Sequence, residues 1–329
     1  LEAISRFKGT HSAAPNFAYD LCVASTTEES RQHLDLSTWR FSLNAAEPVR
    51  AHTLDVFNAA FAPHGLSPQT VKPGFGLAEA TLKVTALPRA EPVSFEHVDA
   101  DALARHELRP LAPDDPKTTT IVGCGWGQVD NRTLIVDPDS RQPCPADRVG
   151  EIWFSGPSVA QGYWQRPEAS AETFRAALAD GSGPWMRTGD LGFMRGRELF
   201  VTGRIKDLVI IRGLNHYPQD IELTAEQAHA SIRSSCSAAF AIDTEQGEAL
   251  AIVAEVERTS LRRFNEQEVV SAIREAVATQ HEVAVHTLVF IKPAAIPKTA
   301  TDRSSTMTGT SVGLPCRMCC RNPSGERCR

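Results

Sequence analysis

Hydrophobic and polar residues alternate in short runs along the first two-thirds of the chain. The runs are bounded by Gly or Pro, which is typical of β-strands. We expect strands at 121–122, at 151–154 and at 199–201. Between Ala51 and Ala62 the apolar residues recur at helical spacing and end at a Pro-His-Gly stop, which predicts a helix. This mixture predicts an α/β fold for a large N-terminal part, residues 1–203.

The pattern changes near residue 203, where we place a domain boundary with a hinge at 204–206. Beyond the hinge, residues 207–300 predict a small α+β C-terminal domain. Pro218 fits the first turn of a helix whose apolar stripe includes Ile221 and Ala225. The other elements expected in this domain are strands at 208–211, 238–242, 249–256 and 286–291, and a helix at 266–280.

Two segments lack periodicity. Residues 87–119 form a long, Pro-rich and weakly periodic stretch, which we interpret as an insertion. Long loops of this kind are usually functional or mobile. Residues 301–329 have few large apolar residues, which predicts a disordered tail outside the domain pattern. In this tail Cys316 and Cys319 have CxxC spacing. The cysteines that follow them do not form the separated second pair that a zinc site usually needs, so a metal site is the less favoured interpretation.

The composition of the 329 residues excludes several classes of function. Apolar residues make up 42%, which is enough for a core in each domain. The formal net charge of −6 argues against a general nucleic-acid-binding protein, which needs a basic surface. No run of about eighteen apolar residues occurs, so we expect no membrane span. Scattered single cysteines and no signal peptide favour the cytoplasm.

Candidate chemistry lies in three short motifs. In RTGDLG, the two oxygens of Asp190 could accept hydrogen bonds from a sugar diol, although an Asp after a strand commonly caps a solvated turn. In GFGLAE, Phe75 offers a face for stacking, the glycines allow a ligand to approach the backbone, and Glu79 could hold a cation. The motif NAAEP, at 44–48, either walls a base pocket or ends a strand.

These motifs occur together and in order. The series NAAEP, GFGLAEATL, VGEIWFSGPSVAQGYWQRPE, RTGDLGF and LFVTGRIKDLVIIRGLNHYPQDIE resembles the adenylate-forming superfamily over nearly all of residues 1–300. Within that superfamily, SRFKGTHSAAPNFAYDLC, GLAEATL and IRGLNHYPQDIE are similar to the fatty acyl-AMP ligases in particular.

The resemblance implies a two-step reaction with ATP and Mg²⁺ as cofactors. A fatty acid carboxylate attacks the α-phosphate of ATP, which gives acyl-adenylate and pyrophosphate. The acyl group then passes to the phosphopantetheine thiol of an acyl carrier protein, often in a polyketide or non-ribosomal peptide pathway. The family's fold has a large N-terminal domain and a small C-terminal domain joined by the hinge, and 87–119 falls where this branch has an insertion.

The site residues are carried over from the family motifs. Asp190 is expected to bind the ribose hydroxyls, and Arg204 is expected to be a catalytic cation near the ribose or phosphate. Glu79 is expected at a catalytic magnesium ion, and Lys206 occupies the hinge position. The residues expected to line the nucleotide site are Ala45, Ala46, Glu47, Phe75, Gly76, Asp190 and Arg204.

The sequence departs from the family pattern at both ends. A TSGSTG-like phosphate loop would precede Leu1, and the chain does not open with Met, so we expect a fragment. After Pro297-Lys298-Thr299, Asp302 and Arg303 stand where the family has Gly-Lys. Arg keeps the charge of the family's adenylating Lys but not its geometry, and Asp replaces Gly poorly where φ is positive. A change of reading frame or an aberrant gene end would explain both this departure and the tail.

Three functions remain open on the sequence alone. The leading hypothesis is a fragment of a fatty acyl-AMP ligase with low activity of its own. The alternative enzyme is an acyl-CoA ligase, which the insertion at 87–119 disfavours. The alternative from another class is a non-catalytic remnant, in which residues 207–300 dock a carrier protein and residues 1–203 bind nucleotide weakly or not at all.

Overall fold

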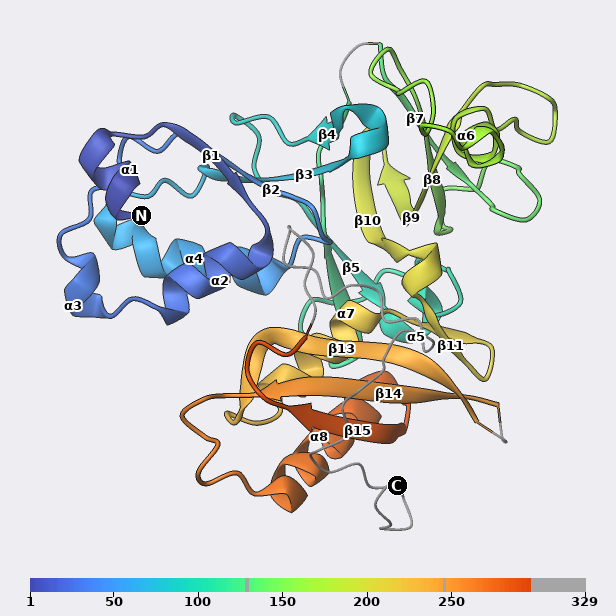
Figure 1. Cartoon of the computed structure of the whole chain (residues 1–329). Helices are drawn as coiled ribbons and strands as arrows, with labels where there is room; N and C mark the ends of the chain where they lie inside the picture. Colours follow the sequence, from blue (N-terminus) through green and yellow to red (C-terminus); the bar gives the residue numbers. More distant parts are fainter. Residues whose placement is uncertain (128–129, 245–246, 297–329) are drawn as a thin grey trace. The chain divides into compact units, whose positions relative to one another are not determined.

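The computed structural model describes residues 1–127, 130–244 and 247–296 (Figure 1). The chain divides into two compact units between Ile205 and Lys206. We call them the N-terminal unit and the C-terminal unit. Each combines strands with helices, so the α/β fold class predicted from the sequence is confirmed.

The first sheet of the N-terminal unit has the order β1-β2-β3-β4. Its first three strands are parallel and β4 is antiparallel to β3. Two helices, α2 and α4, pack together beside it, and the rings of Tyr19 and Phe57 meet edge to face at 5.0 Å between centroids. The elements of this part are α1 (Glu2–Phe7), β1 (His11–Ala14), α2 (Asn16–Ala24), α3 (Glu28–Arg31), β2 (Phe41–Asn44), α4 (Ala51–Phe61), η1 (Ala62–His64), β3 (Val71–Leu77), η2 (Ala78–Ala80) and β4 (Leu82–Ala86).

The second sheet of this unit is antiparallel, with the order β10-β9-β8-β7. One of its two inner strands, β8, is buried from Gly150 to Phe154, which explains why the apolar run there predicted a strand. The remaining elements of the unit are β5 (Phe95–Asp99), α5 (Ala100–Leu103), β6 (Thr118–Val122), β7 (Arg132–Val136), β8 (Gly150–Ser155), α6 (Pro167–Phe174), β9 (Met186–Arg195), β10 (Glu198–Arg204) and the turn η3 (Ile205–Asp207), which continues into the C-terminal unit.

The segment 87–119 is not the structureless loop that its composition suggests. It contains β5 and α5, and β5 pairs with β6 over its full length. Asp99 is buried and caps α5 by accepting from the backbone N–H groups of Asp101 and Ala102. The sequence pattern did not predict these elements, because the strand is only a few residues long and the helix only about one turn, which is too short to give a periodic signal.

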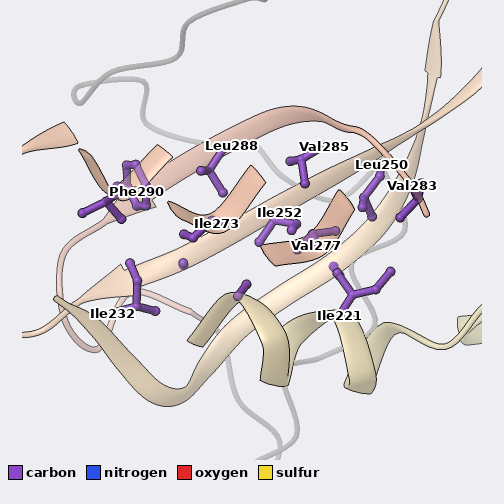
Figure 2. Close-up of a cluster of buried hydrophobic side chains, with 14 of the residues drawn as sticks. Ile221, Ile232, Leu250, Ile252, Ile273, Val277, Val283, Val285, Leu288 and Phe290 are labelled. Carbon is purple, nitrogen blue, oxygen red and sulfur yellow. The ribbon is translucent and has the colours of Figure 1, made fainter. Parts of the chain in front are cut away.

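The C-terminal unit has a three-stranded sheet, β13-β14-β15, in which β13 and β14 are antiparallel and β14 and β15 are parallel. Pro218 opens α7, as the sequence predicts. The core is formed where α7 and α8 pack on the sheet, and Figure 2 shows Ile221, Ile252 and Ile273 within it. The elements are β11 (Val209–Ile211), β12 (Leu214–His216), α7 (Pro218–Gln227), β13 (Ile232–Thr244), β14 (Gly247–Val256), α8 (Glu266–His281) and β15 (Val285–Ile291).

A buried histidine, His216, and a partly buried one, His281, lie near each other in the C-terminal unit. His216 ends β12 and His281 ends α8, where the Nε2 atom of His281 is 2.8 Å from the hydroxyl of Thr224. Burial, reinforced by the nearby His216, lowers the pKa of His281 from 6.5 to about 4, and a hydrogen bond with the backbone of Asp220 opposes the shift. Burial also lowers the pKa of His216. Both imidazoles are therefore neutral at neutral pH.

We expect the C-terminal unit to lose stability as the pH falls from 6.5 to about 4. In this window the unfolded chain binds a proton at residue 281 that the folded unit excludes, so the free energy of unfolding falls with the pH. The separation of the two pKa values corresponds to a loss on the order of 3 kcal/mol. Hydrogen exchange of the α8 amides, corrected for intrinsic rates, measures this dependence. His281→Gln should flatten it, and an unchanged dependence in this variant would contradict the assignment.

Among the described residues, no helix is long and apolar enough to cross a membrane. Within the same ranges, no three His, Cys, Asp or Glu residues are grouped so that they could hold a metal ion. Cys22, Cys124, Cys144 and Cys236 are free thiols, and burial raises the pKa of Cys124 to about 12. The tail cysteines and Arg303 lie outside the described residues.

Candidate nucleotide-binding site

The carboxyl ends of the three parallel strands meet at one edge of the first sheet. Ala14 of β1 stands opposite Asn44 of β2, and Asn44 stands opposite Pro73 of β3. The chain after Asn44 carries the NAAEP residues, and the chain after Pro73 continues to Glu79. Open α/β sheets bind ligands at this edge. The topology therefore brings two of the sequence-predicted motifs to the same place.

The loop that follows β2 is held by Asn16, a buried residue at the start of α2. The side-chain amide of Asn16 donates to the carbonyl of Pro48 at 2.9 Å and accepts from the Asn44 amide at 3.0 Å. Ala46 adopts a positive φ of 80°, which turns the chain away from the strand. Sequence reasoning missed Asn16, because its role depends on a contact between segments far apart in the chain.

Two oxygens of this loop are buried without a hydrogen-bond partner among the described residues: Oδ1 of Asn44 and Oε1 of Glu47. Buried acceptors are costly when unpaired, so they commonly find a partner in water or a ligand. The exocyclic amine of adenine is a donor of the required kind. The predicted lining role of Glu47 therefore agrees with its chemistry.

The glycines of GFGLAE have a packing role that their sequence alone does not suggest. A Cβ on Gly76 would overlap the carbonyl oxygen of Leu82, and a Cβ on Gly74 would lie 2.7 Å from the side chain of Leu43. They allow β4 and β2 to approach β3, and the expected place of Gly76 in the nucleotide site stays a prediction. Phe75 is half-buried and packs against core residues such as Phe154.

Glu79 lies in η2, directly after β3, and its Oε1 atom accepts a hydrogen bond of 2.7 Å from the hydroxyl of Tyr163. The carbonyl of Glu79 also accepts from the amide of Ala160 at 2.8 Å. Burial and the Glu79 carboxylate raise the pKa of Tyr163, and the nearby Arg204 lowers it. Tyr163 is a residue that sequence reasoning quoted in a motif but did not assign. It contacts Glu79 directly, and the charge of Arg204 acts on its pKa.

Asp190 does not lie in a turn after a strand, as its neighbouring glycines suggest. It is part of β9, in a bulge where the three residues Thr188 to Asp190 stand opposite the single residue Ile152. Gly189 has a φ of 71°, a conformation that favours glycine. Bulges redirect side chains and are frequent beside active sites. The capping interpretation of Asp190 is therefore wrong, and the functional one is retained.

Arg204 stands directly opposite Asp190 on the neighbouring strand β10. Its Nε atom is 3.5 Å from Oδ1 of Asp190, and the two side chains are 40% and 14% exposed. A carboxylate held beside a guanidinium at the surface of a sheet can accept from a diol while the cation faces a phosphate. The structure thus brings together two of the residues expected at the ribose.

The bulge is held in place by Glu151, a buried residue of the neighbouring strand β8. One oxygen of Glu151 accepts from the Trp153 indole at 2.9 Å and pairs with Arg187 at 2.8 Å, and the other accepts from the amide of Gly189 at 3.1 Å. Thr188 adds a bond from its hydroxyl to the carbonyl of Ile152. A charged residue inside the apolar run GEIWF is the signal that could have identified Glu151.

Lys206 is an exposed residue of η3 and the first residue of the C-terminal unit. Arg303, expected at the position of the family's adenylating Lys, lies outside the described residues. The site as described is therefore formed by the N-terminal unit alone.

Known proteins match both units. Residues 1–164 match the family described as AMP-binding enzyme, and residues 206–308 match the AMP domain of Disco-interacting protein 2-like proteins. The medium-chain-fatty-acid–acyl-carrier-protein ligase JamA of Moorena producens is 46% identical over an alignment of 306 residues, which covers 92% of this chain and 52% of JamA. The chain belongs to the AMP-binding enzyme family.

Other proteins similar to this AMP-binding enzyme support the same family assignment. The long-chain-fatty-acid–AMP ligase FadD32 of Mycolicibacterium smegmatis is 36% identical over an alignment of 327 residues, which covers 90% of this chain and 52% of FadD32. A structure from a study of fatty acyl-adenylate ligases of E. coli and L. pneumophila has a TM-score of 0.82 at 32% identity, covering 93% of this chain and 53% of that one. The resemblance inferred from the motifs is confirmed.

A further solved structure is the fatty acyl-adenylate ligase of L. pneumophila in complex with acyl adenylate and pyrophosphate. It is 38% identical, has a TM-score of 0.63, and aligns over 90% of this chain and 52% of its own. The chain spans about half the length of each relative.

Proposed function

We propose that this chain carries the adenosine-binding side of a fatty acyl-AMP ligase. The observation that carries the proposal is the bulge in β9, which presents Asp190 beside Arg204. The unpaired oxygen of Glu47 at the carboxyl edge of the first sheet supports an adenine site. Phe75, Ala45 and Ala46 belong to the same edge by the pairing of β2 with β3.

In the proposed reaction, a fatty acid carboxylate oxygen attacks the α-phosphorus of ATP, and the bond from that phosphorus to pyrophosphate breaks. A carrier-protein thiol then attacks the acyl carbon, and AMP leaves. Asp190 accepts from the ribose hydroxyls and so fixes the α-phosphate. Arg204 stabilises the negative charge that spreads over the phosphorus as it becomes five-coordinate. Catalysis of this kind is mostly positioning plus cationic stabilisation.

Glu79 fits a magnesium site of the usual nucleotide type, in which the protein gives one or two carboxylates and phosphates and water supply the rest. The hydrogen bond from Tyr163 fixes the orientation of the Glu79 carboxylate. Bound there, Mg²⁺ would neutralise part of the phosphate charge. Tyr163 and Ala160 are the contacts that place Glu79 for this role.

The acceptor proposed for the acyl group is a carrier protein rather than coenzyme A. The support is the identity of the relatives, of which JamA is named for transfer to an acyl carrier protein. The folded segment 87–119, with β5 and α5, agrees with a branch-specific insertion.

Free thiols such as Cys22 suit a reducing compartment, which supports a cytoplasmic protein.

The test is formation of acyl-adenylate from ATP, Mg²⁺ and a medium- or long-chain fatty acid, followed by mass spectrometry. In parallel, calorimetric titration with a non-hydrolysable acyl-adenylate mimic measures the site directly. We expect saturable binding at one site and slow adenylate formation. Failure of both measurements on a folded chain would overturn the proposal. Adenylate that transfers to coenzyme A as readily as to a carrier protein would favour the acyl-CoA ligase instead.

A further inference from the structure

The N-terminal unit has a large cavity whose described lining shares no residue with the proposed nucleotide site. Its volume is about 1190 Å³, and residues of β4 and β7 line it. These two strands are edge strands of the two four-stranded sheets, so the cavity lies between two sheet edges (Figure 1). Sites for small molecules usually have volumes of about 300–1,000 Å³, so this cavity has room for a long ligand.

Much of the cavity wall is apolar. Phe41, Leu87 and Met194 contribute aliphatic and aromatic surface, and two indoles, those of Trp126 and Trp185, face the same space. Leu87 and Trp185 are buried, which makes this part of the wall a fixed surface of the core. An apolar chain or ring that moves from water onto such a wall is stabilised by the hydrophobic effect.

Each of the two indoles carries a guanidinium. The Cζ atom of Arg197, in the turn between β9 and β10, lies 3.7 Å from the centroid of the Trp126 ring. The Cζ atom of Arg132, the first residue of β7, lies 4.9 Å from that of Trp185. Stacking on an indole uses the face of a guanidinium and leaves the N–H groups at its edge for an acceptor.

The cationic side chains of the cavity keep donors for a ligand. Among the described residues, neither Arg197 nor Lys83 forms a hydrogen bond or an ion pair. Arg132 forms a single weak hydrogen bond, of 3.5 Å, to the hydroxyl of Ser155. In the described lining these three cations are opposed by one acidic residue, Asp130. The cavity is therefore positively charged in a chain whose net charge is −6.

We propose that this cavity, which we call the Trp–Arg cavity, binds an anionic amphiphile. The carboxylate or phosphate of the ligand pairs with the stacked guanidiniums, and its apolar part lies against the indoles and Met194. Both oxyanions match the planar fork of Arg, which can donate two parallel hydrogen bonds to them. The site goes beyond the proposed function, because it uses none of the residues proposed to bind the nucleotide.

The test titrates the full chain, without ATP, with dodecanoate, dodecyl phosphate and dodecanol below the concentrations at which they form micelles. Calorimetry gives the affinity, and tryptophan fluorescence reports binding because Trp126 and Trp185 line the cavity. We expect saturable binding of an anion, with dodecanol at least about 10-fold weaker, since hydrogen bonds to charged groups exceed neutral ones. Tighter binding of dodecanoate would identify free carboxylates as the ligands, and tighter binding of dodecyl phosphate would identify phosphate headgroups.

Three variants locate the bound anion. Arg197→Gln and Arg132→Gln each remove one stacked cation, and each should weaken binding of the preferred anion about 10-fold. Lys83→Gln leaves both stacked pairs in place, so it tests the charge of the cavity even if an Arg variant fails to fold. Arg105→Gln changes an exposed Arg outside the cavity lining and is the matched control, which should bind as the wild type does.

The results that support the inference differ from those that contradict it. Saturable binding of an anion that weakens in the cavity variants but not in Arg105→Gln supports the Trp–Arg cavity. Equal affinity for dodecanol and the two anions would overturn the role of the guanidiniums. Absence of saturable binding, or an affinity for the anion that is unchanged in every folded cavity variant, would overturn the site.

Discussion

Glu151→Ala is expected to lower the free energy of unfolding of the N-terminal unit by about 3–5 kcal/mol, the usual cost of removing one partner of a buried ion pair. The variant leaves Arg187 without its carboxylate and the Trp153 indole and Gly189 amide without their acceptor. Urea denaturation followed by tryptophan fluorescence measures the loss. All five tryptophans of the chain lie before Lys206, so the signal reports this unit alone.

The matched control is Glu172→Ala, which removes an exposed carboxylate on α6 and should change the unfolding free energy by less than about 0.5 kcal/mol. Glu151→Gln keeps an acceptor for the indole, so it should lose less than Glu151→Ala. A loss below about 1 kcal/mol for Glu151→Ala would mean that the brace under the bulge is not stabilising.

Asp190→Ala is expected to weaken binding of the acyl-adenylate mimic about 100-fold without unfolding the chain. The variant removes both acceptors for the ribose hydroxyls, and hydrogen bonds to a charged acceptor are worth about 1.5–3 kcal/mol each. Asp190 pairs with a partly exposed Arg204 at 3.5 Å, so its loss should lower the urea midpoint less than the loss of the buried Glu151 does. Calorimetric titration gives the affinity. Asp139→Ala, in an exposed turn, is the control that should bind as the wild type does.

Glu151 and Asp190 are linked through the β9 bulge, which allows a further test of both assignments. If the Glu151 network holds the bulge, then Glu151→Gln should also weaken binding of the mimic, although Glu151 is buried and does not reach the ligand. Equal affinity in Glu151→Gln and the wild type would show that the bulge keeps its shape unaided. Undiminished affinity in Asp190→Ala would remove the ribose assignment and, with it, the main support for the nucleotide site.

Much of the fold could be predicted from the sequence, because its strands and helices have strong local patterns. The helix from Ala51, the Pro218 helix start and the buried strand at Glu151 all follow from spacing and from Gly and Pro. The β5–α5 segment was missed because short elements leave no periodic signal. The assignment of Asp190 came from its motif and not from its surroundings, and the local expectation of a turn was wrong.

The residues that were missed share one property. Asn16, Glu151 and Tyr163 act through partners far away in the chain: Asn16 on the loop after β2, Glu151 under the β9 bulge, and Tyr163 on Glu79. A single sequence carries their identity but not their pairing. The glycines of GFGLAE add a second role that the sequence does not reveal, because Gly76 also allows the close packing of β4 on β3.

The bulge in β9 contains an even number of extra residues. Three residues of β9 stand opposite one residue of β8, so β9 has two residues more than its partner there. Side chains alternate with period two, so Met186 before the bulge and Leu191 after it keep the faces that an uninterrupted strand would give them. Loss of two residues here would erase the bulge and leave the flanking core in phase. Loss of a single residue would move the side chains on one side of the bulge to the opposite face of the sheet. This stretch can therefore shorten or lengthen in pairs, but not by single residues.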